Sequence, residues 1–162
     1  MKKFLIFIYL LMFLCFEVVD SPVVQGEPHT MKNKNYQNYG TIIIDKINLN
    51  RKFYKDGNVD KEISMLSVSK FPDVENSLLV LAGHSGTGIA AFFNYLYKME
   101  LGDKVKIIYN QEEFNYKIID IYKIKKDGNA EIYKFQNKRT LILITCTNNE
   151  KDKQTIYVAI EN

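Results

Sequence analysis

The sequence predicts an all-β domain, folded as a closed β-barrel or a β-sandwich. Tyr and Phe are plentiful, with 11 and 10 copies, and the β-branched residues add to the bias toward strands. Short apolar runs separated by turn residues follow one another from residue 39 to the end of the chain. One stretch, residues 90–99, has apolar residues at helical spacing. Short strands with one short helix, over about 120 residues, are typical of barrels and sandwiches.

Each expected element is a short run with its own pattern. The run SLLVLAGH (77–84) is continuously apolar, which is typical of a strand buried on both faces. The dipeptide QE (111–112) is an expected turn between two strands. In chain order we expect strands in YGTIIIDKINL (39–49), SLLVLAGH (77–84), GDKVKIIYN (102–110), EEFNYKIIDIYKI (112–124), RTLILITCT (139–147) and QTIYVAIEN (154–162), with a helix in AAFFNYLYKM (90–99).

The length and charge of the chain exclude some classes of protein. With 162 residues, the chain is long enough for one domain with a hydrophobic core. Its formal net charge of +3 is small and its lysines are dispersed, whereas a nucleic-acid-binding surface needs clustered positive charge. We therefore expect no nucleic-acid partner.

The first 20 residues, MKKFLIFIYLLMFLCFEVVD, predict a membrane segment. Lys2 and Lys3 precede an unbroken apolar run from Phe4 to Phe16, the order found in signal peptides and in uncleaved signal anchors. Residues 17–20 lack the small residues of a cleavage site, so we favour an anchor and keep a cleaved signal peptide as the alternative. The two lysines would stay in the cytoplasm and direct the rest of the chain outside.

Residues 21–38 are polar, contain two prolines and show no apolar period, which predicts a flexible stalk before a domain spanning 39–162. One of the two histidines, His29, falls in this stalk, where we expect a solvated linker residue. Cys15 falls in the membrane segment, so Cys146 is the sole cysteine of the expected outer domain. A single cysteine in such a domain is either buried and inert or reactive.

The stretch LVLAGHSGTG (79–88) ends an apolar run on a histidine and a glycine-rich turn. Gly83 and Gly88 have the spacing of a P-loop, but the two residues after Gly88 are not the lysine and the serine or threonine of that motif. A nucleophile elbow, G-x-S-x-G, is also excluded because Thr87 replaces its last glycine. The stretch therefore indicates neither a phosphate-binding loop nor a serine nucleophile.

His84 and Cys146 form a different candidate pair, because each lies at the end of an expected strand. A thiol attacks as the thiolate, and a nearby imidazole stabilises that state and protonates a leaving amine. Taken singly, each residue has a structural interpretation, since a cysteine at a strand end is often a small buried apolar residue. Together, as the His and the Cys of the expected outer domain, they favour a catalytic pair on one rim of a barrel.

Three stretches together resemble the sortase family: LLVLAGHSGTG (78–88), FFNYLYKMELGDKV (92–105) and TLILITCT (140–147). Sortases carry an L-x-G-H strand end, an F..L..L..GD.V segment and a T-L-x-T-C strand in this order. The stretch YGTIIIDKINLNRKFY (39–54) also resembles the opening strand of the family, so the likeness covers residues 39–162. It leaves the sortase class open, with class B-like and class D-like types as the alternatives.

The resemblance implies a closed eight-stranded β-barrel with one or two short helices and the activity of a cysteine transpeptidase. Cys146 would attack a carbonyl of an LPxTG-like sorting signal, between threonine and glycine, and form a thioacyl enzyme. An amine of a cell-wall precursor or of a pilin would then take the acyl group, with His84 as acid and base. The implied partners are surface proteins with a C-terminal sorting signal and, through the anchor, the bacterial cell membrane.

No cofactor or metal is expected. Calcium binds to some sortases, but the acidic loop FPDVEN (71–76) lacks the ligand spacing of a calcium loop.

The chain departs from the family at one position. Sortases usually place an arginine at the start of the strand after the cysteine, and neither Arg51 nor Arg139 lies there. Gln154 fills the matching position and can donate a neutral hydrogen bond to an oxyanion. Lys153 or another cation is an alternative donor, and weak or absent activity is a third outcome. Thr147, directly after the cysteine, is a further candidate for oxyanion or substrate binding.

Two other functions stay open on the sequence. The missing arginine favours, as the alternative, a catalytically weak or inactive sortase-like barrel that binds sorting-signal peptides. A small exported cysteine peptidase of another lineage is the third candidate, although the sequence shows no Asn or Asp placed to orient His84.

Overall fold

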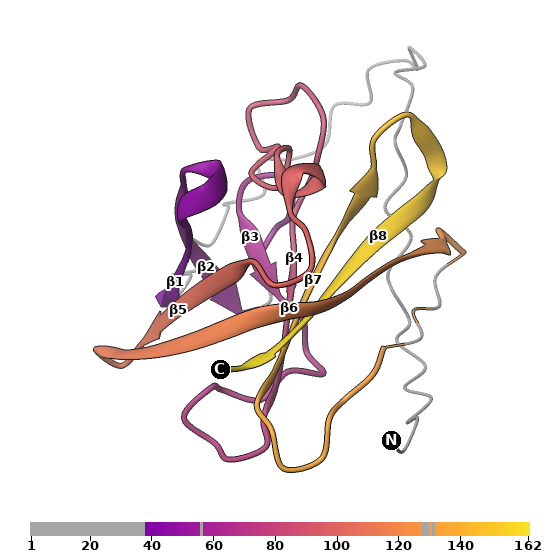
Figure 1. The fold of residues 1–162 in the computed structure, drawn as a ribbon. Helices are drawn as coiled ribbons and strands as arrows, with labels where there is room; N and C mark the ends of the chain where they lie inside the picture. Colours follow the sequence, from indigo (N-terminus) through magenta and orange to yellow (C-terminus); the bar gives the residue numbers. More distant parts are fainter. Residues whose placement is uncertain (1–37, 56, 128–129, 131) are drawn as a thin grey trace.

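The computed structural model describes residues 38–55, 57–127, 130 and 132–162. They form a closed barrel of eight strands in the order β1-β2-β3-β4-β7-β8-β6-β5 (Figure 1), which confirms the expected all-β fold. The strands are β1 (Asn38–Ile44), β2 (Leu49–Lys55), β3 (Ile63–Met65), β4 (Leu78–Ala82), β5 (Lys104–Tyr109), β6 (Glu112–Lys125), β7 (Thr140–Thr147) and β8 (Glu150–Glu161). The described residues contain two 3₁₀ helices, η1 (Asp45–Ile47) and η2 (Leu96–Lys98).

The expected membrane segment (1–20) and the stalk up to residue 37 lie outside the described residues. Within the residues that the structure does describe, no helix has the length and hydropathy that a membrane span requires.

The largest differences between expected and observed elements are in two stretches. The stretch 90–99, expected as a helix, is mostly turn and contains only η2. Its apolar residues Phe93 and Leu96 are fully buried, so their spacing reflects packing against the core. The stretch 39–49, expected as one strand, contains β1, η1 and the start of β2. Asn48 makes this turn possible because it adopts a left-handed conformation with φ of 52°, which asparagine tolerates.

Two hydrophobic clusters lie on opposite faces of the sheet formed by β4, β7 and β8. The inner cluster fills the barrel and includes Leu81 and Leu143. The outer cluster includes Val80, Ile142 and Ile156, and it is covered by Ala130, Ile132 and Phe135 from the connection between β6 and β7. Because side chains alternate along a strand, successive residues of β4 and β7 serve the two clusters in turn. This alternation decides which residues reach each face at the strand ends.

Candidate active site

β4 and β7 run side by side in parallel and bring the two candidate residues together. Leu78 pairs with Thr140, and the ladder continues to the pair of Ala82 and Ile144. Continued for two more residues beyond this last pair, the same register sets His84 opposite Cys146. His84 and Cys146 are therefore as far apart in the sequence as the two residues of each pair in the ladder.

Three hydrogen bonds continue the contact between the two segments beyond the last ladder pair. The backbone N–H of Gly83 donates to the carbonyl of Ile144 (3.2 Å). The hydroxyl of Thr145 donates to the carbonyl of Gly83 (2.8 Å), and the hydroxyl of Ser85 donates to the carbonyl of Cys146 (2.6 Å). The residues on either side of the candidate histidine are therefore tied to the strand that carries the thiol.

The glycine-rich turn after β4 is shaped by close packing. A Cβ atom at Gly83 would lie 2.9 Å from the ring of Phe93, a distance that side chains do not tolerate. The N–H of Phe93 donates to the carbonyl of His84 (2.9 Å), and the N–H of Gly86 donates to the side chain of Asn94 (3.1 Å). Gly86 itself has a φ of 121°, which favours glycine. The turn is thus a compact structural support for His84.

His84 and Cys146 are close enough to change each other's ionisation. Hydrogen bonding with Cys146 raises the pKa of His84, against the opposing effect of burial, and Asp60 raises it further. Hydrogen bonding with His84 lowers the pKa of Cys146, again against burial, and the charge of Lys126 adds to the lowering. Both directions favour a thiolate beside an imidazolium, the state in which a cysteine is a nucleophile.

Asp60 was missed by the sequence reasoning, which found no carboxylate placed to orient His84. Its Oδ1 atom lies 2.9 Å from Nε2 of His84, so the absence expected from the sequence is wrong. Asp60 belongs to the connection between β2 and β3, where its N–H donates to the side chain of Asn58 (2.9 Å). An Asn two residues before an Asp indicates a turn, but no local pattern predicts that this turn lies beside β4.

Gln154 lies next to the thiol-bearing strand, as expected from its place in the sequence. It pairs with Cys146 across β7 and β8, and its side chain is 8% exposed. Directly paired residues of neighbouring strands place their side chains on the same face of the sheet. The amide of Gln154 therefore shares the outer face with the sulfur of Cys146.

Thr147 and Lys153 are engaged with other partners. The hydroxyl of Thr147 shares a 2.8 Å hydrogen bond with that of Thr155, so it is fixed within the sheet. The ammonium group of Lys153 lies 2.6 Å from a carboxylate oxygen of Glu150. Lys153 is therefore a poor alternative to the missing arginine.

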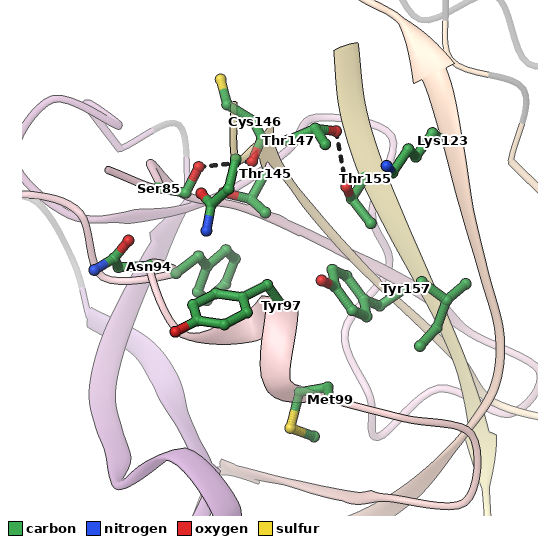
Figure 2. Close-up of a pocket in the computed structure, with 13 residues that line it drawn as sticks. Ser85, Asn94, Tyr97, Met99, Lys123, Thr145, Cys146, Thr147, Thr155 and Tyr157 are labelled. Carbon is green, nitrogen blue, oxygen red and sulfur yellow. Dashed lines mark hydrogen bonds between the residues drawn. The ribbon is translucent and has the colours of Figure 1, made fainter. Parts of the chain in front are cut away.

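A pocket of about 290 Å³ is lined in part by Cys146, near the end of β7 (Figure 2). Figure 2 shows the sulfur of Cys146 at the outer edge of this pocket, pointing away from Tyr97 and Met99. The remaining wall is mainly polar and aromatic, and the residues that form it include Ser85, Asn94, Thr145, Thr147, Lys123 and Tyr157. The volume is near the lower limit for ligand sites, which suits a short portion of a peptide or an amine.

Comparison with known proteins assigns the chain to a family. A model of the sortase domain matches residues 42–161. The chain belongs to the sortase family. Sortase D of Bacillus subtilis (strain 168) is 30% identical to this sortase over 120 residues, which are 72% of this chain and 58% of that protein. The chain thus spans less than two thirds of the length of this relative.

Solved structures show the same fold. A lid mutant of sortase A from Corynebacterium diphtheriae superimposes on this sortase with a TM-score of 0.70 at 21% identity, covering 82% of this chain and 74% of that chain. Sortase C1 from Streptococcus agalactiae gives a TM-score of 0.70 at 24% identity, covering 77% of this chain and 67% of that chain. Members of the sortase family are known as cysteine transpeptidases, and the structural likenesses show that this chain has the fold of that family.

Proposed function

We propose that this sortase cleaves an LPxTG-like sorting signal and transfers the surface protein to an amine of the cell wall or of a pilin. The observation that supports this proposal best is the placement of His84 and Cys146 at the ends of adjacent parallel strands. Their mutual pKa shifts favour the thiolate and the imidazolium. The 30% identity to a sortase D supports the class D-like alternative.

The proposed reaction has two transfers of the same acyl group. The Cys146 thiolate attacks the carbonyl carbon of the peptide bond between threonine and glycine. The imidazolium of His84 gives its proton to the nitrogen that leaves. The carbon–nitrogen bond breaks and a thioester remains on Cys146. An incoming amine then attacks the thioester, His84 takes its proton, and the thiolate leaves. Atoms and charges balance over the two steps without a cofactor.

Two features support a role for the surroundings of the thiol. The pocket beside Cys146 can receive the incoming amine or the residues that flank the scissile bond. Exclusion of water from such a pocket favours transfer to an amine over hydrolysis. Gln154 shares a face of the sheet with the sulfur, which supports a hydrogen bond from its amide to the oxyanion.

The proposed location is outside the cytoplasmic membrane, with residues 1–20 as a single anchor. The two N-terminal lysines and the apolar run that follows support this orientation. The substrates would then be surface proteins held at the membrane by their own C-terminal sorting signals.

The decisive test incubates the full chain with an LPxTG-type peptide and hydroxylamine or a lysine amine. We expect a ligated product and, by intact-mass measurement, a transient acyl adduct on Cys146. Cys146→Ala abolishes the adduct and His84→Ala abolishes turnover. Cleavage that does not depend on the added amine would indicate a peptidase instead.

The second candidate function is a barrel that binds sorting peptides without catalysis, favoured by Gln154 in place of arginine. It predicts peptide binding by the wild-type chain with no acyl adduct, and equal binding by Cys146→Ala and His84→Ala.

A further inference from the structure

Lys126 lies beside the candidate nucleophile, just after the end of β6. Its Nζ atom is 3.9 Å from the Sγ atom of Cys146. Its backbone N–H donates a 2.7 Å hydrogen bond to the carbonyl of Asp152 in β8, which continues the pairing of β6 with β8 past Lys125. The backbone of Lys126 is therefore fixed next to the strand that pairs with β7.

The register of three strands explains how this lysine reaches the sulfur. Ile124 of β6 pairs with Gln154 of β8, and Gln154 pairs with Cys146 of β7. The three side chains therefore share one face of the sheet. Lys126 lies two residues beyond Ile124, and its backbone still pairs with β8. Because side chains alternate along a paired strand, its side chain is on the same face as that of Ile124.

Both arginines of the chain contact groups other than the thiol of Cys146. Arg139 donates a 2.6 Å hydrogen bond to Glu161, and Arg51 lies over the ring of Phe92 at 5.2 Å from its centroid. Lys153, the cation considered from the sequence, is held in an ion pair. Among the residues that the structure describes, the positive charge that reaches the sulfur besides the histidine comes from the lysine after β6.

We propose that Lys126 is a catalytic residue that supplies the positive charge absent at Gln154, first to the Cys146 thiolate and then to the oxyanion on the attacked carbonyl. The inference rests on the proposed transpeptidase function and adds a residue to its site. A cation near a partly buried thiol favours the ionised form. The oxygen that becomes negative is on the carbon bonded to Sγ, so the flexible ammonium group can contact it as well.

The electrostatics of the thiol agree with this role. Hydrogen bonding with His84 lowers the pKa of Cys146 most, and the charge and contact of Lys126 lower it further. His84 and Lys126 are the charged groups that act on the thiol, while Gln154 is neutral. The two cations come from different segments, one just after β6 and one in the turn after β4, so each can be removed separately.

The first experiment measures the thiol without any peptide substrate. It compares full-length wild type with Lys126→Met, Lys126→Arg and the control Lys125→Met, which removes the neighbouring exposed lysine of β6. The rate of alkylation by iodoacetamide is followed as a function of pH, at the level of the Cys146 peptide because the chain also contains Cys15. We expect the profile of Lys126→Met to move to higher pH. Lys126→Arg and Lys125→Met keep the wild-type profile.

The second experiment measures the rate at which an LPxTG-type peptide forms the acyl adduct on Cys146. We expect Lys126→Met to slow it at least about tenfold, with little change for Lys126→Arg and Lys125→Met. A Lys126→Met enzyme that keeps both the wild-type alkylation profile and the wild-type acylation rate overturns the proposal. If wild type forms no adduct with sorting peptides, the proposed function fails, and the alkylation profile still decides whether Lys126 acts on the thiol.

Discussion

The Oδ1 atom of Asp60 lies 2.9 Å from Nε2 of His84, so a carboxylate from the β2–β3 connection contacts the ring beside Cys146. The Asp60 side chain is 60% exposed, and water weakens such an interaction. We therefore expect Asp60→Asn to lower turnover several-fold, in contrast to the loss of about 10⁴-fold when a buried aspartate behind a catalytic histidine is replaced. Steady-state kinetics with a sorting peptide and an amine measure this loss.

The same substitution has a signature in the pH dependence. Besides the larger effect of Cys146, the carboxylate of Asp60 raises the pKa of His84, because it favours the charged ring. Asp60→Asn lowers that pKa, so the alkaline limb of the kcat/KM profile moves to lower pH. Asp73→Asn is the matched control, since Asp73 is exposed and precedes β4 at the other end of the strand. Superimposable profiles for wild type and Asp60→Asn would contradict an orienting role.

His84 should control the ionisation of the thiol. Hydrogen bonding with His84 is the largest cause of the lowered pKa of Cys146, so His84→Ala raises that pKa toward its ordinary value. At neutral pH the fraction of thiolate falls, and alkylation of Cys146 by iodoacetamide requires a higher pH. Site-resolved mass spectrometry follows the reaction, and an unshifted profile would mean that the two side chains do not interact in solution.

Gly83 and Gly88 offer a matched pair for testing the turn. A Cβ atom at Gly83 meets the ring of Phe93 at 2.9 Å, whereas nothing lies within 4 Å of a Cβ atom at Gly88. Gly83→Ala should lower the free energy of unfolding by about 1–3 kcal/mol because a packed interior resists added volume. Gly88→Ala should be nearly neutral. Urea unfolding measures both, and equal values would show that the ring of Phe93 moves aside without cost.

Gln154 should act on the oxyanion and leave the thiol unaffected. Its amide is neutral and shares the outer face with the sulfur, so Gln154→Ala lowers turnover by about an order of magnitude or more without moving the alkylation profile. Gln154→Arg places a charge there and raises turnover. An unchanged rate for Gln154→Ala would exclude it as an oxyanion donor.

The candidate pair of His84 and Cys146 could be predicted from the sequence because each residue follows a recognisable strand. The runs that precede His84 and Cys146 are mainly apolar, and each candidate residue was expected at or next to the end of a strand. The parallel pairing of these strands, which the structure adds, brings the two ends together. Gln154 followed from its place in the next strand.

Asp60 and Lys126 could not be predicted, because each depends on how distant segments meet. Asp60 lies in a connection without a periodic pattern, and β3, which follows it, has only three residues. Lys126 depends on the pairing of β6 with β8, and β8 begins at Glu150, four residues before the strand expected from the sequence. Hydrophobic patterns miss such a start because the first four residues of β8 are charged and none of them is buried.

The ladder between β4 and β7 also decides where the chain can change in length. A deletion of one residue inside Leu78–Ala82 or inside residues 140–146 turns the following side chains to the opposite face of the sheet. The imidazole of His84 and the sulfur of Cys146 would then no longer lie next to each other. Insertions in the connections between these strands leave their alignment intact. Loops around this barrel can therefore be lengthened or shortened, whereas the number of residues in β4 and β7 has to stay the same.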